Sequence, residues 1–319
     1  MARGEVTTGW ARAKTILESA LRSRAMPAAS VEVGWVKHIG DGLSRVVFGA
    51  HVDVSPDPGG LSGEYVALLP KRDSHREDHA RWVRETRVLR QLCGEELPFR
   101  VPEPVGVFPD RLGPALVRRY LQGIPADLKA GRMSSVRPPC LVGSLAGATH
   151  RIRLGAWPDV PSGHPTRRGH GEEAMAVFDD LSEPEIREAR GWAREHLPST
   201  QPAVLLHGDL LGQNILLCPG EPLALIDWEF CRMGDPAYDL AIVTRGTRRP
   251  FQMADGLSRL LESYEQAGGE RIRPASVHFH EICLAVSWYR AALDGEGAEL
   301  PEQALGRVRG ILGRAAALA

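Results

Sequence analysis

Two aspartates and one asparagine lie close together in the second half of the chain, in a pattern that suits phosphoryl transfer. Asp209 ends the run His-Gly-Asp after a short apolar stretch, and Asn214 follows it within one short loop. Asp227 ends a second apolar run, beyond the turn residues Cys218 to Pro222. Short apolar runs joined by turn residues are typical of a β-hairpin. In that hairpin Asn214 enters one strand and Asp227 leaves its neighbour, so the sequence predicts both side chains at the same end.

This grouping offers oxygen ligands and a general base. Carboxylate and amide oxygens suit Mg²⁺, which proteins usually hold with one or two side chains plus phosphate oxygens and water. We therefore predict that Asn214 and Asp227 bind magnesium. Asp209 remains for a second task, which is to orient an acceptor hydroxyl and accept its proton. The predicted cofactors are Mg²⁺ and, as phosphoryl donor, ATP or GTP.

The same segment resembles the catalytic and metal-binding segments of the protein-kinase fold. His-Gly-Asp-Leu stands in place of His-Arg-Asp, and Ile-Asp-Trp-Glu in place of Asp-Phe-Gly. Gly-Asp-Pro-Ala-Tyr-Asp-Leu-Ala follows, so three motifs occur in order, and the chain resembles the aminoglycoside phosphotransferase family of small-molecule kinases. The resemblance implies that His207 buttresses the catalytic loop. Asp235 and Asp239 are expected to cap a helix and tie it to that loop.

The part of the chain before this segment has the apolar alternation that predicts β-strands. Apolar residues at helical spacing predict helices before and after those strands, and through the second half of the chain. A stretch rich in Pro, Gly, Arg and His, Leu154 to Glu172, is predicted to be a long loop. The predicted fold is α+β and bilobal, of the protein-kinase-like type. A small antiparallel sheet with one helix forms a nucleotide-binding lobe (1–118), and a larger, mostly helical lobe (119–319) carries the catalytic and acceptor sites.

A glycine turn between two N-terminal strands is the predicted phosphate cover. Such a turn can lay backbone N–H groups over phosphates, and standing upstream of Asp209 it is the expected nucleotide lid. Its nucleotide-binding residues would be Gly40, Gly42 and Ser44. By itself a Gly-x-Gly pair is also an ordinary hairpin turn.

Glu85 resembles the helix glutamate that, in kinases, pairs with a lysine on the preceding strand. This chain departs from the pattern, because that strand has the sequence Val66-Ala67-Leu68-Leu69. Lys71 lies two residues beyond Leu69, hence on the same face if the strand continues, and is the predicted phosphate-contacting cation. Pro70 intervenes, however, and a solvated loop charge remains the alternative for Lys71.

The run LVRRYLQG resembles the hinge between the two lobes of a kinase. The resemblance implies that backbone groups near Arg119 and Leu121 hydrogen-bond the nucleotide base. Any strand followed by a glycine has the same pattern, so position alone supports this prediction.

Composition narrows the classes of partner. The chain has 319 residues and a formal net charge of −1, which gives no basic surface of the kind that binds nucleic acid. No apolar run approaches the length of a membrane span, so no membrane partner is expected. The 5 cysteines are scattered and form no C-x-x-C pair. Reduced structural thiols are therefore expected, and with them a cytoplasmic protein.

The sequence predicts a small-molecule O-phosphotransferase that uses a nucleotide donor and a hydroxyl acceptor. The resemblance implies an antibiotic kinase that gives resistance, acting on an aminoglycoside or another hydroxylated antibiotic. A metabolite kinase of the same fold, with a sugar, choline-like or amino-alcohol acceptor, remains open because the acceptor pocket is the poorly readable part. A protein kinase lacks support, since His-Arg-Asp, Asp-Phe-Gly and Ala-Pro-Glu are absent. The missing strand lysine keeps a non-catalytic nucleotide-binding regulator open.

Overall fold

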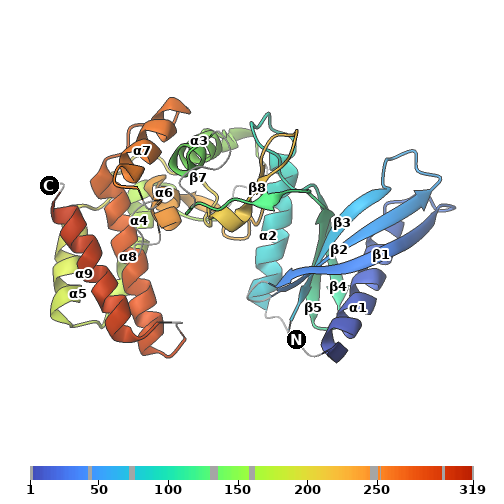
Figure 1. The fold of residues 1–319 in the computed structure, drawn as a ribbon, viewed down its shortest axis with the longest axis horizontal. Coiled ribbons are helices and arrows are strands. Elements are labelled where there is room, and N and C mark those ends of the chain that lie inside the picture. Colours follow the sequence, from blue (N-terminus) through green and yellow to red (C-terminus); the bar gives the residue numbers. More distant parts are fainter. Residues whose placement is uncertain are drawn as a thin grey trace.

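A sheet at one end of the molecule and a group of helices at the other form two lobes (Figure 1). The computed structural model describes residues 3–41, 45–71, 76–129, 136–157, 162–244, 251, 253–296 and 299–317. Throughout these ranges, no helix combines the length and the apolar character that crossing a bilayer requires. The predicted bilobal α+β fold is confirmed.

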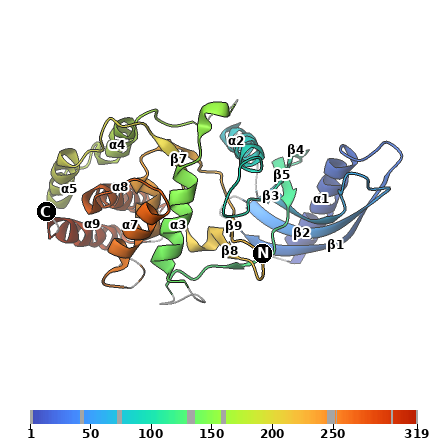
Figure 2. The ribbon, with the colours of Figure 1, turned by 90° about the horizontal axis from the view of Figure 1, so that it is seen from above.

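The N-terminal lobe is a five-stranded antiparallel sheet in the order β1-β2-β3-β5-β4. Its strands are β1 (Ser30–Asp41), β2 (Arg45–Ser55), β3 (Gly63–Pro70), β4 (Pro104–Asp110) and β5 (Gly113–Arg119). Helix α1 (Arg3–Arg22) covers one face of this sheet, as both views show (Figures 1 and 2). Because side chains alternate along a strand, Phe48, Ala67 and Val117 pack under α1 with Leu17.

The other face of the sheet carries a second apolar cluster and two arginines. Val66, Leu68 and Leu116 pack together there, with Val47 beside them. Arg45 and Arg118 share this face by strand alternation, and both contact Glu85 of helix α2 (Arg76–Leu92). Helix α2 lies between the sheet and the helical lobe (Figure 1).

The C-terminal lobe is built around a large apolar core that includes Val142, Leu205, Trp228 and Leu260. Val88, Leu89 and Leu92 of α2 belong to this same core, so α2 is packed into the helical lobe as well as against the sheet. The helices of the lobe are α3 (Pro138–His150), α4 (Arg167–Met175), α5 (Pro184–Glu195), α6 (Ala237–Thr244), α7 (Gly256–Gln266), α8 (Pro274–Leu293) and α9 (Pro301–Ala316). The C-terminal lobe also contains two small sheets. In the first, β7 (Val204–Leu206) pairs with β10 (Arg232–Gly234). The second consists of β6 (Ile124–Pro125), β8 (Ile215–Leu217) and β9 (Ala224–Leu225).

The predicted long loop over 154–172 is wrong in its last part, because α4 begins at Arg167. The side chain of Thr166 caps this helix by accepting a hydrogen bond from the N–H of Gly169. Two glycines give the segment a low helix propensity, which is why its sequence predicts a loop. Tertiary contacts offset that propensity: His170 and Gly171 are buried, and His170 accepts a hydrogen bond from the N–H of Asp235.

Candidate active site

The β8–β9 hairpin brings Asp209, Asn214 and Asp227 to one end. Asn214 Nδ2 donates to the backbone oxygen and to Oδ2 of Asp209, both at 2.8 Å. The N–H of Ile226 donates to the carbonyl of Asn214 at 2.9 Å, in register with the strand pair that follows. Asp227 comes directly after Ile226, so its backbone lies beside that of Asn214 where the hairpin opens.

The oxygen atoms of this group fit a hard divalent cation. Asn214 is buried and its amide nitrogen is committed to Asp209, so its Oδ1 is the atom that can act as a ligand. Asp227 is half-buried and has a φ of 67°, a left-handed conformation that is uncommon for non-glycine residues. In the described part of the chain, no three His, Cys, Asp or Glu side chains cluster as a metal cage. Two oxygen donors without a cage suit magnesium that also binds phosphate oxygens.

His207 links the loop of Asp209 to the strand before Asp227. The imidazole is fully buried, its Nδ1 lies 3.3 Å from the N–H of Asp209, and its Nε2 lies 3.1 Å from the carbonyl of Ile226. Both ring nitrogens are satisfied when Nδ1 accepts from the N–H of Asp209 and Nε2 donates to the carbonyl of Ile226. These contacts hold both halves of the site, which supports the buttressing role predicted for His207.

Asp239, in the first turn of α6, is hydrogen-bonded to the backbone of the catalytic loop. Its carboxylate accepts hydrogen bonds from the N–H groups of His207 (2.8 Å) and Gly208 (2.9 Å), and from His150 Nε2 at 3.1 Å. Burial by itself raises the pKa of this carboxyl, but the histidines and the Gly208 N–H outweigh burial and lower the pKa below its usual value. Asp239 therefore stays ionised.

Asp235 occupies the position just before α6. Its Oδ1 accepts from the N–H of Ala237 at 3.2 Å, and its Oδ2 lies 3.0 Å from His280 Nε2. Burial raises the pKa of Asp235, and the contact with His280 lowers it by more. These bonds support the helix-capping role predicted for Asp235.

The buried carboxylate of Glu85 bonds two arginines from the sheet. Arg45 Nη1 lies 3.3 Å from Glu85 Oε2, and Arg118 Nη1 lies 3.2 Å from Glu85 Oε1. Lys71 Nζ lies instead 3.8 Å from Asp41 Oδ1 at the end of β1. The structure thus does not bring Lys71 to Glu85. The physical reason is strand alternation, since Leu69 packs on the α1 face and Lys71 lies two residues beyond it.

The glycine turn is described only in part. Gly40 lies within β1, where it pairs with Val47 of β2. Gly42 and Ser44 lie outside the described residues. The predicted phosphate cover therefore stays a prediction.

The hinge follows β5 and has apolar clusters on both sides. The N–H groups of Arg119 and Tyr120 bond the carbonyls of Glu103 (2.8 Å) and Glu64 (3.0 Å), so they are occupied within the protein. Leu121 packs with Leu216 and Ala224 of the hairpin sheet. Among the described residues its own N–H has no protein partner, which makes Leu121 the predicted hinge position best able to bind a base.

Sequence reasoning missed the apolar residues that flank this hinge. Leu68 and Leu116 approach it from the sheet, together with Tyr120, and Leu216 approaches it from the helical lobe. The signal that identifies Leu68 and Leu116 is strand alternation, which places them on the face of the sheet away from α1. The signal for Leu216 is the short apolar strand that begins at Ile215, directly after Asn214.

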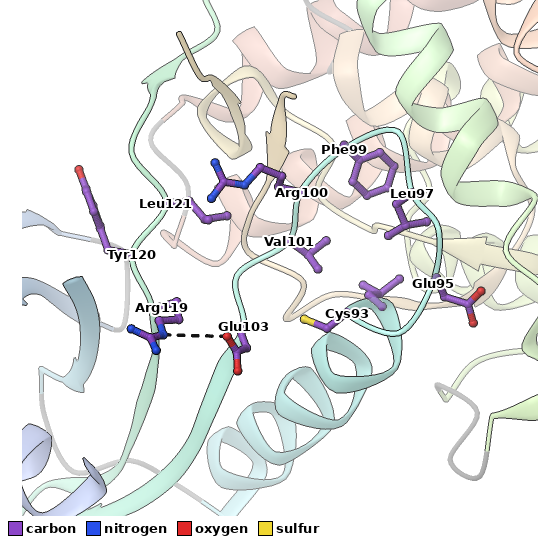
Figure 3. A pocket seen from close by; sticks show the side chains of 11 residues that line it. Cys93, Glu95, Leu97, Phe99, Arg100, Val101, Glu103, Arg119, Tyr120 and Leu121 are labelled. Atoms are coloured by element: carbon purple, nitrogen blue, oxygen red, sulfur yellow. Dashed lines mark ion pairs between the residues drawn. The ribbon is translucent and has the colours of Figure 1, made fainter. Parts of the chain in front are cut away.

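A cavity of about 640 Å³ lies between the connection after α2 and the hinge (Figure 3). An ion pair between Arg119 and Glu103, at 3.9 Å, lies across it, and Cys93, Phe99 and Leu121 line it. None of Asp209, Asn214 and Asp227 lines this cavity. It is therefore a space beside the hinge, separate from Asp209, Asn214 and Asp227.

Comparison with known proteins agrees with this geometry. The family model described as "Phosphotransferase enzyme family" matches residues 57–278, a range that includes Glu85, the hinge and the β8–β9 hairpin. The chain belongs to the phosphotransferase enzyme family.

A curated relative of this family member is the viomycin phosphotransferase of Streptomyces vinaceus. It is 30% identical over 172 residues, which are 49% of this chain and 59% of that protein. The chain thus matches about three fifths of the length of this relative.

Solved structures of other phosphotransferases share the fold over nearly the whole chain. The macrolide 2′-phosphotransferase of Brachybacterium faecium has a TM-score of 0.62 at 19% identity, covering 92% of this chain and 97% of that one. The GDP complex of aminoglycoside 2′-phosphotransferase-IIIa has a TM-score of 0.65 at 14% identity, covering 94% and 99%. The predicted protein-kinase-like fold is confirmed by these likenesses.

Proposed function

We propose that this phosphotransferase moves the γ-phosphoryl group of ATP or GTP to a hydroxyl group of a small molecule. The observation that carries the proposal is the meeting of Asp209, Asn214 and Asp227 at the open end of one hairpin. Phosphoryl transfer requires that the protein position the reactants and neutralise charge in the transition state, more than it requires covalent chemistry. A general base and two oxygen ligands for a metal ion meet this requirement.

Each side chain then has one task. Asp209 orients the acceptor hydroxyl and accepts its proton, and the amide of Asn214 fixes the Asp209 carboxylate for that work. Asn214 Oδ1 and Asp227 are the groups that would hold Mg²⁺, which when bound neutralises charge on the phosphates. Residues 1–118 would bind the nucleotide from above, and residues 119–319 would bind the acceptor. A reaction that consumes a nucleoside triphosphate would take place in the cytoplasm.

We further propose that the acceptor is an antibiotic. Support comes from the curated relative, named for viomycin, and from structural neighbours named for macrolides and aminoglycosides. Viomycin is the first compound to test because its phosphotransferase is matched at 30% sequence identity. The fold alone does not select the acceptor, because structural neighbours with this fold are named for different acceptors, macrolides in one case and aminoglycosides in another.

Nucleotide-coupled turnover tests this function. The purified protein is assayed with Mg²⁺ and ATP or GTP against viomycin, aminoglycosides, macrolides and small hydroxyl metabolites, beside Asp209→Asn. An exposed aspartate, Asp255, supplies the control variant Asp255→Asn. We expect phosphorylation of one compound that Asp209→Asn reduces at least a hundredfold and Asp255→Asn leaves unchanged. Turnover that survives in Asp209→Asn, or folded protein that binds neither nucleotide, overturns the proposal.

A further inference from the structure

The strand that should supply a cation to Glu85 has an apolar side chain at that place. On β3, Val66 and Leu68 face away from α1, and Leu68 pairs across the sheet with Val47 and with Leu116. Leu68 is 4% exposed and packs among these side chains. The buried residues of β3 on the Glu85 side of the sheet therefore include Val66 and Leu68, and β3 offers no cation to a nucleotide.

A guanidinium from the neighbouring strand fills the gap. Arg45 opens β2 directly after the glycine turn and shares a face with Val47, the partner of Leu68. It is 4% exposed, its Nη1 lies 3.3 Å from Glu85, and its Cζ lies 5.1 Å from the centre of the Trp82 ring. Two residues of α2, one turn apart, thus fix the position of Arg45 from one side.

The same guanidinium reaches the metal-binding end of the hairpin. Arg45 Nη2 donates to Glu229 Oε2, two residues beyond Asp227. Burial lowers the pKa of Arg45, but the negative charges of Glu85, Glu229 and Asp227 outweigh burial and raise the pKa. Arg45 therefore lies within the electrostatic reach of Asp227, and it stays charged although it is buried.

Two hydrogen bonds use two of the five N–H donors that a guanidinium presents. The planar fork of a guanidinium also matches phosphate oxygens in pairs. Arg118, the second partner of Glu85, comes from β5 next to the hinge, on the side of the sheet away from the glycine turn. Of the two arginines, Arg45 is thus the one placed between the glycine turn and Asp227.

We propose that Arg45 is the cation that contacts the phosphates of the nucleoside triphosphate, in place of a β3 lysine. The inference rests on the proposed function, and it assigns to β2 the role that the sequence suggested for Lys71. Glu85 and Trp82 position the guanidinium, and Glu229 holds it beside Asp227.

Nucleotide binding measured by calorimetry tests the assignment without knowledge of the acceptor. The probes are ATP and GTP with Mg²⁺, and adenosine and guanosine, which lack phosphates. We expect Arg45→Ala to weaken triphosphate binding at least tenfold and nucleoside binding less than twofold. Lys71→Ala tests the rival cation and is expected to change triphosphate binding less than twofold. Lys14→Ala, an exposed cation of α1, is the matched control.

A rescue variant separates a phosphate contact from a structural role. Leu68→Lys in the Arg45→Ala background restores a cation on the same face of the sheet, and we expect it to recover at least half of the lost triphosphate selectivity on a logarithmic scale. If Arg45→Ala does not fold, the charge-balanced pair Arg45→Met with Glu229→Gln is measured instead, with the same selective loss expected.

The outcomes distinguish the two proposals. Wild-type protein that binds no nucleotide overturns the proposed function. Wild-type protein that binds triphosphate, together with an Arg45 variant of equal triphosphate selectivity, overturns the assignment of Arg45 alone. Loss in Lys71→Ala in place of Arg45→Ala returns the role to Lys71.

Discussion

Replacing Asp239 by asparagine removes one negative charge from beneath the catalytic loop. The carboxylate is fully buried and accepts from the N–H groups of His207 and Gly208 and from His150 Nε2. Asparagine has the same shape but only one acceptor oxygen, and its NH₂ group faces a donor. At least one of these three donors is then left buried without an acceptor.

The expected cost follows from those contacts. A hydrogen bond to a charged group contributes about 1.5–3 kcal/mol, and a buried donor left without an acceptor costs about 1–3 kcal/mol. Asparagine keeps at most two of the three bonds, because Oδ2 accepts from the His207 N–H and from His150 while Oδ1 accepts from the Gly208 N–H, and the bonds it keeps are no longer made to a charged group. We therefore expect Asp239→Asn to lower the free energy of unfolding by about 3–4 kcal/mol. The N–H groups of His207 and Gly208 attach the loop of Asp209 to Asp239, so turnover of the folded fraction should also fall at least tenfold.

Urea unfolding at neutral pH measures the first effect, and nucleotide-coupled turnover measures the second. Asp255→Asn is the matched control, because Asp255 pairs with Arg259 at 2.6 Å on the exposed side of α7. An exposed pair contributes little, so this control should change the free energy of unfolding by less than about 1 kcal/mol. A loss below about 1 kcal/mol for Asp239→Asn would refute the role assigned to this carboxylate.

The pH dependence gives a second, independent check of the same carboxylate. The pKa of Asp239 is lower in the folded protein than in the unfolded chain, where it is about 3.9. Its stabilisation is therefore present above about pH 4 and is lost as the pH falls through the folded pKa. The gap in stability between wild type and Asp239→Asn should close under acid conditions. A gap that stays constant down to acid unfolding contradicts an ionised Asp239.

Four further substitutions test other parts of the structure. Gly208→Ala should abolish turnover, because Gly208 has a φ of 83° and its added Cβ would overlap the carbonyl of Phe230; a thermal melt shows whether the fold persists. Burial and nearby positive groups lower the pKa of His170 from 6.5 to about 3 in the folded protein. Below pH 6.5 His170 therefore binds a proton in the unfolded chain only, which lowers the free energy of unfolding by about 2 kcal/mol at pH 5. His170→Gln should remove this part of the pH dependence of the free energy of unfolding, measured by urea unfolding at a series of pH values. Gly143→Ala should cost about 1–3 kcal/mol, because its Cβ would lie 2.5 Å from a carbonyl of α7, whereas Gly191→Ala, exposed on α5 with no atom near, should gain about 0.5–1 kcal/mol in urea unfolding.

Local sequence predicts the hairpin that carries Asp209, Asn214 and Asp227 because every residue involved lies within one short segment. The turn residues, the two apolar runs and the polar ends are all visible there, and the register follows from their lengths. The helix over 167–175 is invisible by the same reasoning. Its glycines oppose a helix, and the contacts that stabilise it come from residues such as Asp235, far along the chain.

The partner of Glu85 was beyond the sequence for a different reason. Which face of β3 turns toward α2 depends on which face α1 covers, and that is a tertiary fact. Counting from Leu69 selects Lys71, whereas the register of β2 against β3 selects Arg45. A shift of one residue moves every side chain of a strand to the other face. Motif spacing along one strand therefore cannot find a cation that comes from its neighbour.

Helix α2 explains why a cation from either strand could serve the same site. Its apolar side, Val88 and Leu89, is part of the core of the helical lobe, while Glu85 points to the sheet. Glu85 therefore lies on a helix fixed to the core that also contains Leu225, near the end of the strand before Asp227, and it faces more than one strand of the sheet. A cation that reaches Glu85 is brought near Asp227 whether it starts on β2 or β3. The geometry thus constrains where the charge lies and leaves open which strand supplies it, and this is why the loss of a β3 lysine does not by itself argue against catalysis.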